Sequence, residues 1–161
     1  MAGIEFNISK GREVEFYNRV KSNDPANSAL IMMVLATGSV GLNGLRDFDT
    51  FAAILAGGYT EVTNTGYSRQ TITDSTLLAW APDDTNNRVL LYLPFQTYTT
   101  VLAGNTWDIV VVGYDSDTTG GTDANIVPVT ANELRYFGAA VVPNGDDIFI
   151  DFSVTGWVQA V

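Results

Sequence analysis

The sequence predicts a mainly β fold: an antiparallel sandwich or barrel-like sheet with one or two short α-helices near the N-terminus. Two observations predict it. Short apolar stretches typical of strands recur along the chain, and residues typical of turns separate them. The 161 residues contain neither a fixed-period repeat nor a linker, so we expect residues 1–161 to form a single β-rich domain.

The first element is an apolar alternation at residues 3–8, typical of a strand. It has two interpretations. Residues 1–9 either contribute an edge strand to the chain's own sheet or form an N-terminal arm that pairs with a neighbouring subunit. Basic residues follow in an otherwise acidic chain, which suits an acidic partner surface. The resulting candidates for partner binding are Ile4, Phe6, Ile8, Lys10 and Arg12.

A helix is predicted at residues 9–21, with Ser9 as its N-cap. Its apolar residues recur on one face: Val14, Tyr17 and Val20. The helix should end at residues 23–25, because the residue before a proline leaves the α region. The apolar run at 28–36 that follows has the length and flanks of a fully buried strand, with a helix as the alternative.

A second short helix is predicted at residues 47–56, with Asp47 as its cap and the glycine pair at 57–58 as its end. Its apolar face consists of Phe48, Phe51 and Leu55. Beyond it the chain should be β, with a bend at 94–96. The expected strands are 60–73, 88–93, 97–102, 107–114 and 147–154, and an apolar segment at 156–158 closes the chain. Of these, 107–114 is the strongest candidate for a central strand.

The charge balance excludes two classes of partner. The chain carries 18 acidic and 8 basic residues, a net charge of −10, whereas a nucleic acid or an anionic membrane surface requires a basic face. The longest apolar stretch, residues 29–36, is far shorter than the roughly 20 residues that span a bilayer. The first twenty residues contain no apolar core typical of a secretory signal, so we expect a soluble protein made in the cytoplasm.

The residue types also limit the chemistry. The chain has no histidine and no cysteine, so Ser-His and Cys-His nucleophiles and thiolate metal sites are absent. Carboxylate pairs of the kind glycosidases use remain at Asp83 with Asp84, at Asp115 with Asp117 and at Asp146 with Asp147. All of them lie in contexts where aspartate forms turns. We therefore predict a protein that is not an enzyme and uses no cofactor.

The loop at residues 115–125 (DSDTTGGTDAN) needs separate consideration. Its first half matches the beginning of a calcium-binding loop of the EF-hand type, but the closing position holds Ile126 in place of glutamate. The calcium candidates are Asp115, Asp117 and Asp123. A solvated loop between two strands is favoured, so no metal is predicted.

Three segments of the chain carry a resemblance to known proteins. The first is 10–29, which includes FYNRVKSNDPANSA; the second joins GYSRQ at 66–70 to APDDTNNR at 81–88; the third is YDSDTTGGTDANIVP at 114–128. Together they resemble a group of small virion structural proteins of tailed phages. The resemblance covers residues 9 to about 135. It is an overall likeness of sequence without a catalytic motif, so no functional residue can be carried over from it.

The resemblance implies a component of the phage particle. A short, acidic, β-rich chain without fibre repeats is similar to the decoration (cement) proteins that bind the outside of the head and stabilise the capsid. The implied partners are the major capsid protein and the chain itself, as a homo-oligomer such as a trimer, in a virion assembled in the host cytoplasm. The alternatives are a neck or tail component, or a carbohydrate-binding host-attachment module that uses Trp80, Trp107 or Trp157 for stacking.

Overall fold

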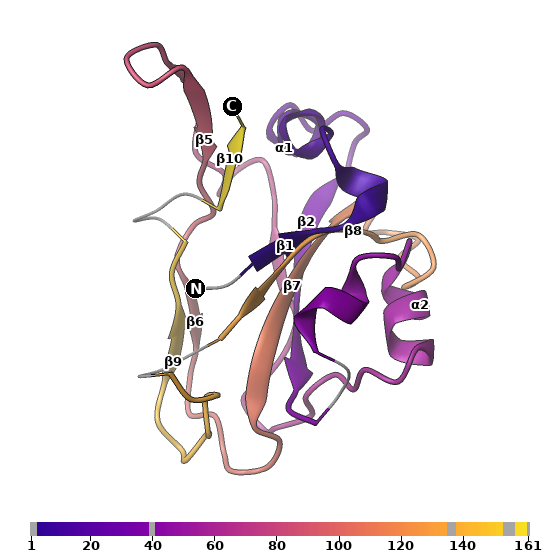
Figure 1. Cartoon of the computed structure of the whole chain (residues 1–161), viewed down its shortest axis with the longest axis vertical. Helices are drawn as coiled ribbons and strands as arrows, with labels where there is room; N and C mark the ends of the chain where they lie inside the picture. Colours follow the sequence, from indigo (N-terminus) through magenta and orange to yellow (C-terminus); the bar gives the residue numbers. More distant parts are fainter. Residues whose placement is uncertain (1–2, 39–40, 135–137, 153–156, 161) are drawn as a thin grey trace.

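The computed structural model describes residues 3–38, 41–134, 138–152 and 157–160, and its centre is a five-stranded sheet in the order β1-β8-β7-β2-β3 (Figure 1). The five strands are β1 (Gly3–Glu5), β8 (Val127–Glu133), β7 (Trp107–Asp115), β2 (Ala29–Ala36) and β3 (Gln70–Ile72). A three-stranded sheet contains β10 (Val158–Ala160), β5 (Arg88–Leu91) and β4 (Pro82–Asp83). The last sheet pairs β6 (Gln96–Tyr98) with β9 (Ile148–Ile150), and all strand pairs are antiparallel. The predicted mainly β fold is confirmed.

Strands β2 and β7 form the middle of the main sheet. All eight residues of β2 are buried, because both faces of the sheet are covered. A strand buried on both faces has a continuous run of apolar residues in its sequence. The predictions of a buried strand at 28–36 and a central strand at 107–114 are therefore confirmed.

Each face of the main sheet has its own layer. Helix α1 (Glu13–Lys21) and the two small sheets cover one face. Alternate residues of β2, such as Met32, point toward this layer. Helix α2 (Phe51–Ala56) and the 3-10 helix η2 (Leu42–Leu45) cover the other face, toward which Met33 points. Figure 1 shows α2 on the side of the sheet opposite to β6 and β9. Within the described ranges no helix is long and apolar enough to cross a membrane.

The first helix begins later than predicted. Residues Asn7–Ser9 form a separate 3-10 turn, η1, and α1 starts at Glu13 without any side-chain cap. Gly11 separates the two with a φ of +75°, a left-handed conformation that suits glycine. The predicted N-cap at Ser9 is wrong, because its hydroxyl donates to the carbonyl oxygen of Pro128 in β8.

The second helix is also shorter than predicted. It begins after Thr50, whose hydroxyl accepts a hydrogen bond from the Ala53 N–H at 3.1 Å. Asp47 is therefore not the cap; its carboxylate accepts a hydrogen bond from the Asn7 side chain at 2.6 Å. The predicted end is confirmed, because α2 stops at Gly57.

The β half follows the prediction only in part. Of residues 60–73, only Gln70–Ile72 form a strand, because the chain turns at Gly66, where φ is +89°. Strand β8 was not predicted: Pro128 interrupts its pattern, and the ladder to β7 shifts register between Val112 and Gly113 to accommodate it. The strands expected at 88–93, 97–102 and 147–154 are cut to three or four residues, and 153–156 lie outside the described residues.

Of the two interpretations of the N-terminus, the structure has the edge strand. β1 pairs with β8, and the side chains of Ile4 and Phe6 are buried, with 6% and 0% exposure. Ile8 packs against the same core cluster, whereas Lys10 and Arg12 are exposed. As the chain is folded here, the apolar candidates for partner binding face its own interior.

Candidate interaction surface

The two-stranded sheet of β6 and β9 has an apolar outer face. Its inner face holds Tyr98 and Ile150, both buried in the core cluster beside the main sheet. Successive side chains of a strand point to opposite faces, so Phe149 must point outward, and it is 58% exposed. An outward position on a sheet usually carries a polar residue. A large exposed aromatic side chain here is therefore a candidate for binding.

A second aromatic side chain joins it. Phe95, directly before β6, is 52% exposed, and its ring stacks on Phe149 with 5.4 Å between ring centroids. The two rings form one apolar platform held by two different strands. Scattered single apolar residues are normal on a protein surface, but adjacent ones are typical of interaction sites.

The neighbouring loops carry further exposed apolar side chains. The Val101 N–H donates to the Asp146 carbonyl at 3.1 Å, and the Gly145 N–H donates to the Val101 carbonyl at 2.8 Å. These bonds join the segment at 101–102 to the loop at 145–146, and Leu102 is 45% exposed. A hollow of about 660 Å³ lies beside them, lined by residues 139–144 and 146–149. We define the apolar surface as Phe95, Leu102, Val142 and Phe149.

Sequence reasoning missed this surface, because it predicted strands at 97–102 and 147–154 without assigning a buried and an exposed face to them. One signal was present: Ile148, Phe149 and Ile150 are three consecutive apolar residues in a strand. Because side chains alternate between faces, such a triplet always places an apolar residue on the outside of a sheet that has one face buried.

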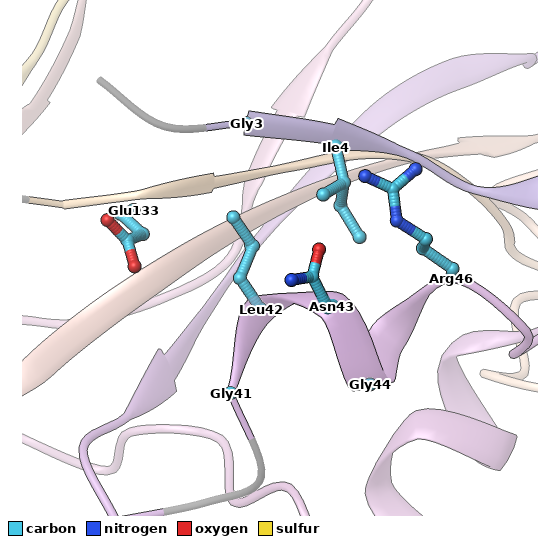
Figure 2. Close-up of a pocket in the computed structure, with 8 residues that line it drawn as sticks. All are labelled: Gly3, Ile4, Gly41, Leu42, Asn43, Gly44, Arg46 and Glu133. Atoms are coloured by element: carbon cyan, nitrogen blue, oxygen red, sulfur yellow. The ribbon is translucent and has the colours of Figure 1, made fainter.

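A second hollow, of about 510 Å³, lies between β1 and η2 (Figure 2). Figure 2 shows the side chains of Ile4 and Leu42 directed into it, with Arg46 near Ile4 and Glu133 at the other end. Among the described residues of the lining, Glu133 is the only one with a carboxylate. Because carboxylate-based hydrolysis requires two such groups, this hollow lacks the residues for it.

Two of the predicted carboxylate pairs contain aspartates that serve turns. Asp83 accepts hydrogen bonds from Asn86 and Arg88, and these bonds lower its pKa. Asp117 accepts from the hydroxyl and the N–H of Thr119, which lowers its pKa in the same way. A catalytic general acid needs the opposite shift, a pKa raised by burial or by a like charge. Asp146 and Asp147 line the larger hollow, and both are exposed.

The calcium candidates do not converge. The Asp115 carboxylate accepts a hydrogen bond from the Asp117 N–H at 3.0 Å, as in an aspartate turn. Asp123 is engaged by Arg69, whose guanidinium donates to both of its carboxylate oxygens. Among the described residues, no group of three acidic side chains is placed to hold a metal ion.

Arg69 is the centre of an ion-pair network that we call the Arg69 cluster. Its guanidinium donates to Asp123 and also to both carboxylate oxygens of Glu61, at 2.8 and 2.7 Å. Tyr67 donates to Glu61 at 2.7 Å and accepts from the Val34 N–H of the central strand β2. The cluster therefore fastens the loop at 115–125 and the irregular segment at 60–70 to the main sheet.

Replacing Arg69 with alanine should destabilise the protein by about 2–3 kcal/mol, because two carboxylates that are only 23–32% exposed lose their cation. Urea unfolding measures the change. Arg19→Ala is the control, because Arg19 pairs with Glu15 on the exposed face of α1 and such pairs contribute little. Equal stability of Arg69→Ala and the wild type would refute the structural role.

The same variant should respond differently to pH. Hydrogen bonds from Arg69 lower the pKa of Asp123 below its ordinary value of 3.8, against a smaller effect of burial. A lowered pKa stabilises the fold above that ordinary value, and the stabilisation is lost as the pH falls through the folded-state pKa. The difference in stability between wild type and Arg69→Ala should therefore shrink in acid.

Two of the three tryptophans that could stack on a sugar are buried. Trp107 and Trp157 are buried, with 0% and 7% exposure, so neither presents a ring face to a sugar. Trp80 is half-buried, packs against the core, and donates its indole N–H to the side chain of Asn18.

In the part of the chain that the structure describes, the apolar surface with the larger hollow beside it is the best candidate for a functional site. Its four exposed apolar side chains are of the kind found at protein–protein contacts. Comparison of the chain with protein-family models, with curated proteins and with solved structures found no match.

Proposed function

We propose that this chain is a structural subunit of a tailed-phage particle, without enzymatic activity, that binds the outside of the head and stabilises the capsid. The resemblance of residues 9 to about 135 to small virion proteins supports the proposal, and the apolar surface is the structural observation that carries it. Stacked aromatic rings on an outer sheet face are a typical centre for a protein–protein interface.

The proposed mechanism is binding linked to assembly. The subunit contacts neighbouring copies of the major capsid protein, and its site exists only once the shell is assembled. A ligand that binds only the assembled state stabilises that state by mass action. Copies of the subunit themselves associate as an oligomer on the head.

The test is a binding experiment with particles. Purified protein is mixed with heads that lack it and, separately, with purified tails, and each mixture is sedimented. We expect the protein to sediment with heads only and to raise the temperature at which the heads release their DNA. Sedimentation with tails only would favour a neck or tail component, and binding to neither would refute the proposal.

A further inference from the structure

We infer that the apolar surface receives a protein segment that presents an apolar side chain flanked by basic residues. The inference rests on the proposed function for the partner's identity and adds the surface that binds it and the chemistry of the segment. The apolar part follows from the hollow of about 660 Å³ next to Phe149, whose ring remains 58% exposed. An anchoring side chain inserted there would contact the ring of Phe149, on which Phe95 stacks.

The charge around the surface indicates the flanking residues. Residues 93–103, which contain β6, carry no charged side chain, and residues 138–151 carry three aspartates and no lysine or arginine. Asp146 and Asp147 lie at the hollow itself, and both are exposed. An apolar centre with an acidic rim is complementary to an apolar anchor with a basic rim.

Both carboxylates are held in place. Asp147 accepts a hydrogen bond from the Thr100 N–H at 2.8 Å, and Asp146 accepts from the Asn144 side chain at 2.8 Å. Each bond uses one oxygen, and among the described residues the other oxygen of each carboxylate has no partner, so a lysine or arginine of the partner can bind it. The two aspartates therefore form an acidic rim on the loop at 143–147.

A second copy of this chain is a poor occupant. A symmetric contact would bring the acidic rims of two chains together, in a protein with a net charge of −10. A head-to-tail contact would need basic residues of a second copy at the rim, and the chain has only eight lysines and arginines. Two of them, Arg12 and Arg19, already pair with Glu15 of their own chain, at 3.0 and 2.9 Å.

The experiment uses a probe that does not depend on phage heads. A displayed library of random short peptides is selected on the wild-type protein, and the bound peptides are measured again on variants. Phe149→Ser removes the exposed ring, and Leu78→Ser is the matched control, because Leu78 is 54% exposed and is not part of the apolar surface. Circular dichroism verifies that both variants remain folded.

We expect selected peptides to combine an apolar anchor with lysine or arginine, and their affinity to fall about tenfold or more on Phe149→Ser but not on Leu78→Ser. The double change Asp146→Asn and Asp147→Asn keeps the amide oxygens as acceptors. It should weaken binding and reduce its dependence on salt. Peptides that bind Phe149→Ser equally well, or that lack basic residues, would overturn the inference, as would a wild-type dimer that Phe149→Ser abolishes.

The two proposals can fail separately. If the wild type does not sediment with heads but the selected peptides require Phe149 and basic residues, the proposed function is wrong and the surface stands. If wild type and Phe149→Ser bind heads equally and no peptide depends on Phe149, the head-binding function stands and the inferred surface is wrong.

Discussion

Deletion of residues 2–8 should unfold the domain or leave it with only residual stability. The segment contains β1, whose three residues pair with β8 at the edge of the main sheet. It also contains Phe6, a fully buried side chain whose N–H donates to the Val129 carbonyl at 3.1 Å. Removing both exposes the core cluster between the sheet and α2.

The expected size of the effect comes from Phe6 alone. Truncating a buried phenylalanine to alanine typically costs about 3–5 kcal/mol, and a domain has a total stability of about 5–15 kcal/mol. The deletion also removes Ile4, which is 6% exposed, and the pairing of β1. The sum approaches the full stability of the domain, so thermal unfolding followed by circular dichroism should show no cooperative transition or a greatly lowered midpoint.

The single variant Phe6→Ala tests the same reasoning with the strand in place. The double variant Lys10→Ser and Arg12→Ser is the control, because both side chains are exposed and the change should leave the unfolding midpoint nearly unchanged. If the protein without residues 2–8 unfolds at the wild-type temperature, these residues do not contribute a structural strand. That result would favour the N-terminal arm.

The central part of this fold could be predicted because local sequence and environment agree there. The continuous apolar run of β2 requires two covered faces, and β7 has the same pattern in nearly every residue. The helix starts could not be predicted as well. Ser9 and Asp47 have the chemistry of caps, but tertiary contacts with Pro128 and Asn7 occupy their side chains.

The candidate site was less predictable than the fold. The N-terminal residues Ile4 and Phe6 have the pattern of an exposed apolar edge, and only the partner strand β8 shows that they are buried. β8 itself was hidden by Pro128. Conversely, Phe95 and Phe149 resemble core residues in the sequence, and their exposure depends on the pairing of two strands about fifty residues apart.

Replacement of Trp107 by alanine should be the most damaging single substitution in the core beneath the apolar surface. Trp107 is the largest fully buried side chain, and its ring makes edge contacts with Tyr98 of β6 and with Tyr67. Its indole N–H donates to Asn64 at 3.0 Å. The Asn64 amide donates in turn to the carbonyl of Leu102, a member of the apolar surface.

The main chain of Trp107 supports the same region. It exchanges two hydrogen bonds with Val141, at 2.8 and 2.9 Å, directly before the exposed Val142. One residue thus holds β6, the Leu102 segment and the 139–142 segment together. Because these segments carry the apolar surface, a cavity at Trp107 should loosen the surface as well as the core.

Trp107→Ala should lose about 3–5 kcal/mol of stability, from lost packing and from the cavity it leaves. Trp107→Phe separates the two roles of the side chain. It keeps most of the ring contacts but leaves the Asn64 carbonyl oxygen without its donor, which should cost about 1–3 kcal/mol. Urea unfolding gives both values. In Trp107→Ala, the rate of hydrogen exchange should rise more, relative to the wild type, in residues 96–102 and 139–142 than in β2. A uniform rise across the chain would contradict the idea that Trp107 supports the apolar surface.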